Sequence, residues 1–247
     1  MSNCLVFGII GGAGVAATNK FNHLLEQKIT KGKASRDSHH PTVISYQATQ
    51  VPSRSMFLEG RGESFVPGYI KISNDLKNSG ATILCMTCNT AHYAIDEIQS
   101  SIGIPFINLV REVVKAVKKD KYGTVGIMAS SGTVQSNIYD KYFQKEYPEA
   151  KIIYPSDEMQ SEVTRGIINI KNMNRFSGLT DSERPKAIFK NVCMHLQENG
   201  ADVVVSGCTD IRVDFSGKDC AISLIDSLEV LVDVIFNMHN TDLVSYE

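Results

Sequence analysis

The chain has 247 residues, enough for one large domain or two small ones with a buried core. Its formal net charge is −2 and it has no long basic run, so we expect neither nucleic acid nor a membrane surface as a partner. No apolar run approaches the roughly 18 residues of a spanning helix, and the N-terminus lacks a signal peptide's basic start, so we expect a cytoplasmic protein.

Apolar runs alternate with helical patterns along the whole chain. In the first half, strands are expected at residues 5–10, 42–46 and 81–85, and helices at 15–28, 67–78, 93–98 and 110–119. In the second half, strands are expected at residues 123–128, 151–155, 202–206 and 221–225, and helices at 134–146, 156–172, 181–199 and 227–238.

Two loops in the first half are candidates for binding. Gly11 and Gly12 open a glycine turn after the first strand, where the backbone can approach a substrate closely. A nucleotide phosphate is a weaker alternative, because Ala17 stands where the dinucleotide fingerprint has its third glycine. The long polar loop that contains Arg54 has a length typical of lids and binding loops.

Two cysteines occupy matching places. Cys88 and Cys208 each follow an apolar strand, eight positions after Gly80 and Gly200 respectively. We expect a helix to start after each cysteine, where free N–H groups and the helix dipole favour a thiolate.

The other cysteines are expected to be reduced thiols. Cys4, Cys193 and Cys220 are interpreted as small core or near-core residues. Cys85 and Cys88 form a C-x-x-C that could be a redox pair, but strand alternation would turn Cys85 into the core. No metal site is expected, because no second ligand pair stands at a suitable spacing for zinc.

The matching segments that end at Cys88 and Cys208 indicate a duplicated α/β unit. We expect two pseudo-symmetric lobes with parallel sheets, residues 1–115 and 116–220, and a C-terminal strand and helix, residues 221–247, that return to the first lobe. Ligands of such sheets bind beyond the carboxyl ends of the strands, so Cys88 and Cys208 are expected to face each other across a cleft.

Five motifs resemble the aspartate/glutamate racemases that work without pyridoxal phosphate. They are Gly-Ile-Ile-Gly-Gly at 8–12, Pro-Ser-Arg at 52–54, Cys-Asn-Thr-Ala-His at 88–92, Ser-Ser-Gly-Thr at 130–133 and Gly-Cys-Thr-Asp-Ile at 207–211. His92 and the Arg54 segment make the chain look more like the aspartate racemase branch. Ala13 and Asp210 depart from the family's usual residues in the presumed pocket, which leaves the substrate open.

The resemblance implies an isomerase that needs no cofactor and forms a dimer. Cys88 and Cys208 would be paired acid and base at the α-carbon of aspartate, glutamate or a related amino acid. Arg54 would bind the side-chain carboxylate, and Lys171 is a weaker candidate for that role. His92 is expected mainly to pack or cap. The remaining candidates for substrate binding are Gly11, Gly12, Asn89, Thr90, Thr133, Thr209 and Asp210.

Other functions stay open. Hydantoin racemases and maleate isomerases share the scaffold, and maleate isomerases also use two cysteines. An arylmalonate decarboxylase keeps only one cysteine, so the presence of both Cys88 and Cys208 disfavours it. A dicarboxylate-binding protein without catalysis and a thiol redox protein are rivals from other classes.

Overall fold

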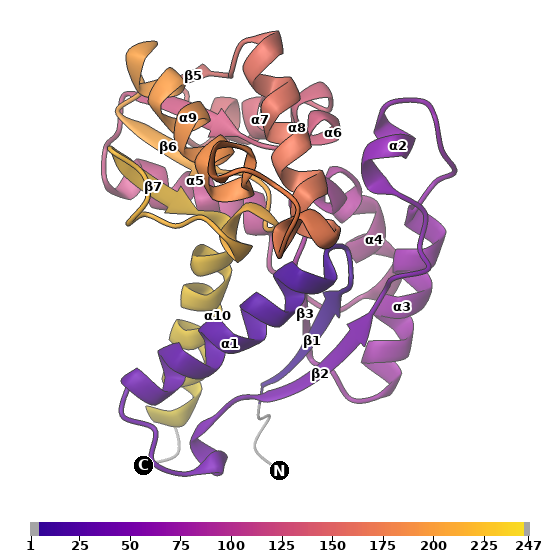
Figure 1. Ribbon diagram of the computed structural model, residues 1–247. Helices are drawn as coiled ribbons and strands as arrows, with labels where there is room; N and C mark the ends of the chain where they lie inside the picture. Colours follow the sequence, from indigo (N-terminus) through magenta and orange to yellow (C-terminus); the bar gives the residue numbers. More distant parts are fainter. Residues whose placement is uncertain (1–4, 245–247) are drawn as a thin grey trace.

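The computed structural model describes residues 5–244, with side chains to residue 240, so Cys4 lies outside the described residues (Figure 1). The first half contains the elements β1 (Val6–Gly11), α1 (Val15–Lys31), η1 (Asp37–His39), β2 (Thr42–Gln47), α2 (Arg54–Leu58), α3 (Val66–Asn78), β3 (Ile83–Met86), η2 (Thr90–Ala94), α4 (Ile95–Ile102) and α5 (Leu109–Lys119), where η denotes a 3₁₀ helix.

The second half repeats this alternation. It contains β4 (Thr124–Met128), α6 (Ser131–Gln135), α7 (Ile138–Glu146), β5 (Lys151–Ile153), α8 (Asp157–Lys171), η3 (Met173–Arg175), η4 (Asp181–Glu183), α9 (Pro185–Glu198), β6 (Val203–Ser206), η5 (Ile211–Val213), β7 (Ser223–Asp226) and α10 (Ser227–Val244).

Two parallel sheets confirm the predicted α/β fold. The first sheet has the order β2-β1-β3 and the second β5-β4-β6-β7, so the first three strands of each have equivalent connections. Parallel strands need crossovers, which the helices between them provide. Because β1 and β3 run in the same direction, Gly11 and Met86 end at the same edge of their sheet.

A single apolar core joins the two halves. Phe7 and Ile9 on β1 belong to the same buried cluster as Val125 and Ile127 on β4. Helix α5 contributes Val113, among other residues, to this cluster, and α1, α7 and α10 complete it. The opposite face of the first sheet packs on α3 and α4, and that of the second on α8 and α9. The shared core holds the two sheets in a fixed relation.

The duplicated halves differ after the cysteine segments. Phe106 forms a single β-bridge with Leu84, whereas the corresponding β7 is a full strand paired with β6. This pairing corrects the expectation that the C-terminal strand returns to the first lobe, because β7 extends the second sheet. Helix α10, in contrast, packs against both α1 and α5 (Figure 1).

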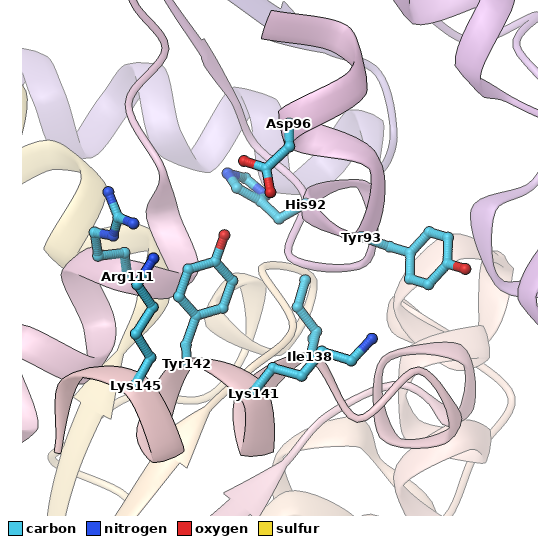
Figure 2. Close-up of a pocket in the computed structure, with 8 residues that line it drawn as sticks. All are labelled: His92, Tyr93, Asp96, Arg111, Ile138, Lys141, Tyr142 and Lys145. Atoms are coloured by element: carbon cyan, nitrogen blue, oxygen red, sulfur yellow. The ribbon is translucent and has the colours of Figure 1, made fainter. Parts of the chain in front are cut away.

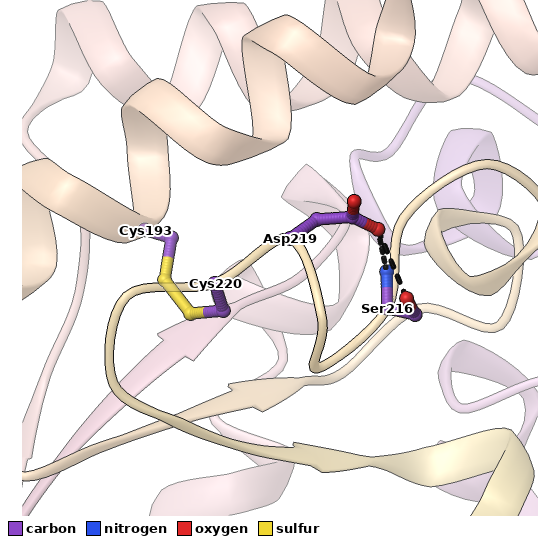
Figure 3. Close-up of a disulfide and its surroundings, with 4 residues drawn as sticks. All are labelled: Cys193, Ser216, Asp219 and Cys220. Atoms are coloured by element: carbon purple, nitrogen blue, oxygen red, sulfur yellow. Dashed lines mark hydrogen bonds between the residues drawn. A yellow bond between two sulfur atoms is a disulfide. The ribbon is translucent and has the colours of Figure 1, made fainter.

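The structure also corrects the interpretation of Cys193 and Cys220 as unpaired thiols. They form a disulfide across 27 positions of sequence, with their Cα atoms 6.2 Å apart (Figure 3). Cys193 lies on α9 and Cys220 in the loop before β7, so the tertiary packing of that loop on α9 brings them together. Lys186 on the same helix pairs with Asp219 at 2.6 Å, which ties the loop to α9 a second time.

None of the helices in the described part of the chain is long and apolar enough to cross a membrane.

Asp226, at the end of β7, gives the fold a testable pH dependence. Its side chain is buried and accepts hydrogen bonds from the Leu228 and Glu229 N–H groups at 2.8 and 3.0 Å. Burial raises the pKa of Asp226 to about 7, and Arg212, 3.7 Å away, offsets only part of that effect. The folded state therefore binds this proton more tightly than the unfolded chain, whose aspartates titrate near pH 3.9.

We expect this residue to lower the free energy of unfolding by up to about 1.4 kcal/mol per pH unit as the pH rises from 4 to 7. Asp226→Asn, which keeps the oxygen acceptor, should remove that dependence and be more stable than the wild type at pH 8. Urea unfolding of both proteins at pH 5 and pH 8 measures the difference. Parallel pH profiles for the two proteins would contradict the prediction.

Candidate active site

Cys88 and Cys208 line one small cavity at the carboxyl ends of β3 and β6. Its volume is about 80 Å³. The cavity is lined by residues of both halves, namely Ala13, Ser53, Arg54, Ser55, Cys88, Asn89, Thr90, Ser130, Ile167, Lys171, Cys208, Thr209 and Asp210. Eight of these were candidates from the sequence, and they meet although up to 156 positions of sequence separate them.

Cys88 is held by the turn that follows β3. The ring of His92 is buried and donates from Nδ1 to the Cys88 carbonyl at 2.8 Å, while its Nε2 accepts from the Leu109 N–H at 3.1 Å. Burial lowers the pKa of His92 to about 4, so the ring is neutral near pH 7. His92 therefore fixes the backbone of Cys88 to the start of α5, in agreement with its expected role in packing and capping.

Arg54 is the cation next to Cys88. Its guanidinium donates to the Ala13 carbonyl at 3.1 Å, which anchors it over the glycine turn. Burial would lower the pKa of Arg54, but attraction to Cys88, Tyr69 and Asp210 outweighs it, and the pKa is raised. A positive charge at this place suits a substrate carboxylate.

Cys208 has a different environment. Only the short η5 follows it, so the helix that we expected to favour its thiolate is absent from this part of the described chain. Burial and the neighbouring Asp210 raise the pKa of Cys208 to about 12, although Lys171 acts in the opposite direction. Cys208 is therefore a protonated thiol at neutral pH, which corrects the expectation of a lowered pKa for both cysteines.

Asp210 and Lys171 form an ion pair at the wall of the cavity. The carboxylate Oδ2 is 2.9 Å from Nζ, and Asp210 is buried. The other carboxylate oxygen, Oδ1, has no hydrogen-bond partner among the described residues and lies where a Cβ on Gly14 would be only 2.2 Å away. Gly14 thus leaves room for Asp210, and the pair supplies both a cation and a free acceptor to the site.

Hydroxyl groups cover the part of the cavity near Cys88. Thr90 Oγ1 is 3.0 Å from Ser130 Oγ and 2.8 Å from Thr133 Oγ1, so the three form one hydrogen-bonded cluster. Asn89 is less available, because its amide donates to Ser227 and its oxygen accepts from Tyr139, both within 2.9 Å. Through these two hydrogen bonds, the side chain of Asn89 links the first half of the chain to the second.

The other predicted residues lie less directly on the cavity. Thr209 lines it, but its hydroxyl donates to the Thr87 carbonyl at 3.0 Å. Gly12 lines only a larger adjoining pocket, while Gly11 packs where a Cβ would be 2.4 Å from Thr18. Thr133 reaches the cavity through Thr90. The glycines are thus explained by close packing of the turn.

Sequence reasoning missed several contributors, namely Ser53, Ser55, Ser130, Ile167 and Tyr69. The hydroxyl of Tyr69 is buried and has no hydrogen-bond partner in the part of the chain that the structure describes. Burial raises its pKa, and Cys88 and Arg54 are close enough to affect it. Nothing in the periodicity of α3 separates this tyrosine from an ordinary core residue, so the sequence carried no signal for it.

Helix α2 closes the cavity from one side. Its residue Ser55 lies directly against Gly132 of α6, where an added Cβ would be 2.7 Å from the Ser55 Cα. This contact docks the segment that carries Arg54 onto the second half of the chain (Figure 1).

A larger pocket of about 680 Å³ adjoins the cavity and shares Ala13, Ser53, Arg54 and Lys171 with it. Within the described residues, no group of three or more His, Cys, Asp or Glu side chains is placed to hold a metal ion.

Comparison with known proteins gives one family. A profile described as Asp/Glu/Hydantoin racemase matches residues 8–235. The broad specificity amino-acid racemase RacX of Bacillus subtilis (strain 168) is 24% identical over 225 residues, which cover 90% of this chain and 92% of that protein.

Solved structures agree. The aspartate racemase of Picrophilus torridus superposes with a TM-score of 0.82 at 25% identity and covers 96% of this chain and 94% of its own. Glutamate racemase from Francisella tularensis, in complex with D-glutamate, has the same fold with a TM-score of 0.61 at 17% identity, covering 96% and 81% of the two chains.

The contact at Gly132 generates a prediction about the site. Gly132→Ala should displace α2, because the new methyl group would meet backbone atoms of Ser55, at a cost of about 1–3 kcal/mol. Hydrogen exchange of residues 54–58 should become faster. Gly123→Ala is the matched control, since its Cβ would meet only an Asp202 oxygen at 3.4 Å. Equal exchange in the two variants would contradict the docking of α2 through Gly132.

Proposed function

The chain belongs to the Asp/Glu/hydantoin racemase family, and on this premise we propose that it is an amino-acid racemase that uses Cys88 and Cys208 as acid and base. The observation that carries the proposal is that the two cysteines line the same cavity, one from each half of the chain. The preferred substrate is an acidic amino acid, aspartate or glutamate, and no cofactor is needed.

Racemisation needs a base on one face of the α-carbon and an acid on the other. A thiolate removes the α-proton and becomes a thiol, while the opposite thiol gives its proton to the carbanion and becomes a thiolate. The electron pair left by the broken C–H bond resides on the substrate carboxylate between these two steps. The enzyme is returned to its starting state by the reverse reaction or by proton exchange with water.

The environments of the two sulfurs suit opposite starting roles. Cys208 is protonated, because burial and Asp210 raise its pKa to about 12. Cys88 has the Arg54 guanidinium as its neighbour instead. In the direction that starts from this state, Cys88 is the base and Cys208 the acid. As Cys88 gains its proton, Lys171 stabilises the new thiolate on Cys208.

The polar groups around the sulfurs can hold the substrate. The hydroxyl cluster of Thr90, Ser130 and Thr133 can donate to the α-carboxylate, whose negative charge grows when the α-proton leaves. Arg54 and Lys171 lie on the side shared with the larger pocket, where the side-chain carboxylate of an acidic substrate would point. The free Oδ1 of Asp210 can accept from the substrate ammonium group.

Relatives of this family act on other molecules, and the same cavity is compatible with maleate isomerisation or hydantoin racemisation. Cationic groups on one side of the cavity favour a second carboxylate in the substrate, which a hydantoin lacks. Maleate has two carboxylates but no α-proton, so deuterium uptake at Cα separates it from an amino acid. A dimeric state and a cytoplasmic location stay predictions.

Substitution of either cysteine tests the two-base mechanism. Cys88→Ser and Cys208→Ser should each reduce racemisation of aspartate or glutamate by roughly 10²–10⁴-fold or more, since one of two proton transfers is lost. Chiral chromatography in deuterated water, with mass increase at Cα, measures the reaction. Cys85→Ala is the control, because Cys85 is buried in the core and does not line the cavity.

Full turnover by either serine variant would remove the two-base mechanism. Loss of activity in Cys85→Ala with reversible oxidation of Cys85 and Cys88 would instead favour a thiol redox protein.

The proposed binding of the substrate's side-chain carboxylate by Lys171 and Arg54 is tested separately. Lys171→Met should lower kcat/KM for aspartate by roughly tenfold or more relative to alanine, because one charged contact to the side-chain carboxylate is lost. Arg54→Gln should show the same selectivity if the guanidinium binds that carboxylate. An equal loss for aspartate and alanine in both variants would contradict this role and leave these cations acting on the sulfurs alone.

A further inference from the structure

A second cleft lies apart from the cysteine cavity. It has a volume of about 300 Å³ and lies between η2, α4 and α5 of the first half and α7 of the second (Figure 2). None of its lining residues lines the cysteine cavity.

Positive charge dominates this cleft. Arg111, Lys141 and Lys145 line it, against the single carboxylate of Asp96. Arg111 is already paired with Glu146, at 3.1 Å. Neither lysine has an acidic partner within the described residues, and both line the cleft together with Arg111 (Figure 2). A bound anion would supply the counter-charge that these lysines lack.

Apolar and aromatic groups form the rest of the lining. The buried Ile138 lines the cleft, and so does the ring of Tyr142 (Figure 2). Lys141 lies over the ring of Tyr93, with Nζ 5.7 Å from the centroid. Such a surface can accept the flat or apolar part of a ligand, as small-molecule sites commonly do.

We propose that this cleft binds a small molecule that carries a phosphate group on an aromatic or apolar body. Two ammonium groups and a guanidinium within one cleft match a doubly charged phosphate better than a single carboxylate. The rings of Tyr93 and Tyr142 and the side chain of Ile138 give room for the body of the ligand.

The cleft is connected to Cys88 through one side chain. His92 lines the cleft, and its ring donates to the Cys88 carbonyl and accepts from the Leu109 N–H. A ligand here would contact α4 in the first half and α7 in the second, so it would bridge the two halves. Binding itself does not depend on the proposed racemase activity and is measured without a substrate.

Isothermal titration calorimetry of the full chain tests the proposal with three probes: phenyl phosphate, inorganic phosphate and benzoate. Phenyl phosphate should bind with one-to-one stoichiometry and more tightly than either of the others, and its affinity should fall as NaCl is raised. The double variant Lys141→Ala/Lys145→Ala should bind it roughly tenfold more weakly or worse, because two charged contacts are lost. Both lysines are exposed, so the variant keeps its core.

The matched control is Lys190→Ala/Lys218→Ala, which removes the same charge from exposed positions that do not line the cleft. It should bind phenyl phosphate as the wild type does. Absence of binding, equal weakening in both double variants, or benzoate binding as tightly as phenyl phosphate would each overturn the proposal.

Discussion

The relation between the two cysteines depends on the apolar core that the sheets share. Side chains of β1 and β4 belong to one buried cluster, and α5 and α10 contribute to it from between the sheets. Without this packing, the carboxyl ends of β3 and β6 would have no fixed distance, and the residues that follow them could not line one cavity. A duplicated unit thereby becomes a site that neither half has alone.

The two halves differ in the charged side chains that lie next to their cysteines. The segment after β3 sits near Arg54, whereas the segment after β6 has Asp210 beside its cysteine, with Lys171 as counter-charge. Two related loops therefore give one sulfur a cationic neighbour and the other an anionic one. This asymmetry distinguishes two chemically identical groups in the proposed reaction.

The sequence predicted the parts of the structure that local patterns determine. Continuous apolar runs located the strands, and the matching spacing of Gly80 to Cys88 and Gly200 to Cys208 revealed the duplication. The environment of Cys208 could not be predicted, since its pKa depends on burial and on charges that the fold brings close. The same holds for the Cys193–Cys220 disulfide and the Asp210–Lys171 pair, which form between segments far apart in the sequence.

The docking of α2 on α6 through Gly132 bears on the speed of an enzyme built this way. Arg54 is the first residue of α2, so any movement that separates Ser55 from Gly132 also withdraws the guanidinium from the cavity. An opening of this kind would interrupt the proposed reaction until α2 docks again, although neither sulfur changes.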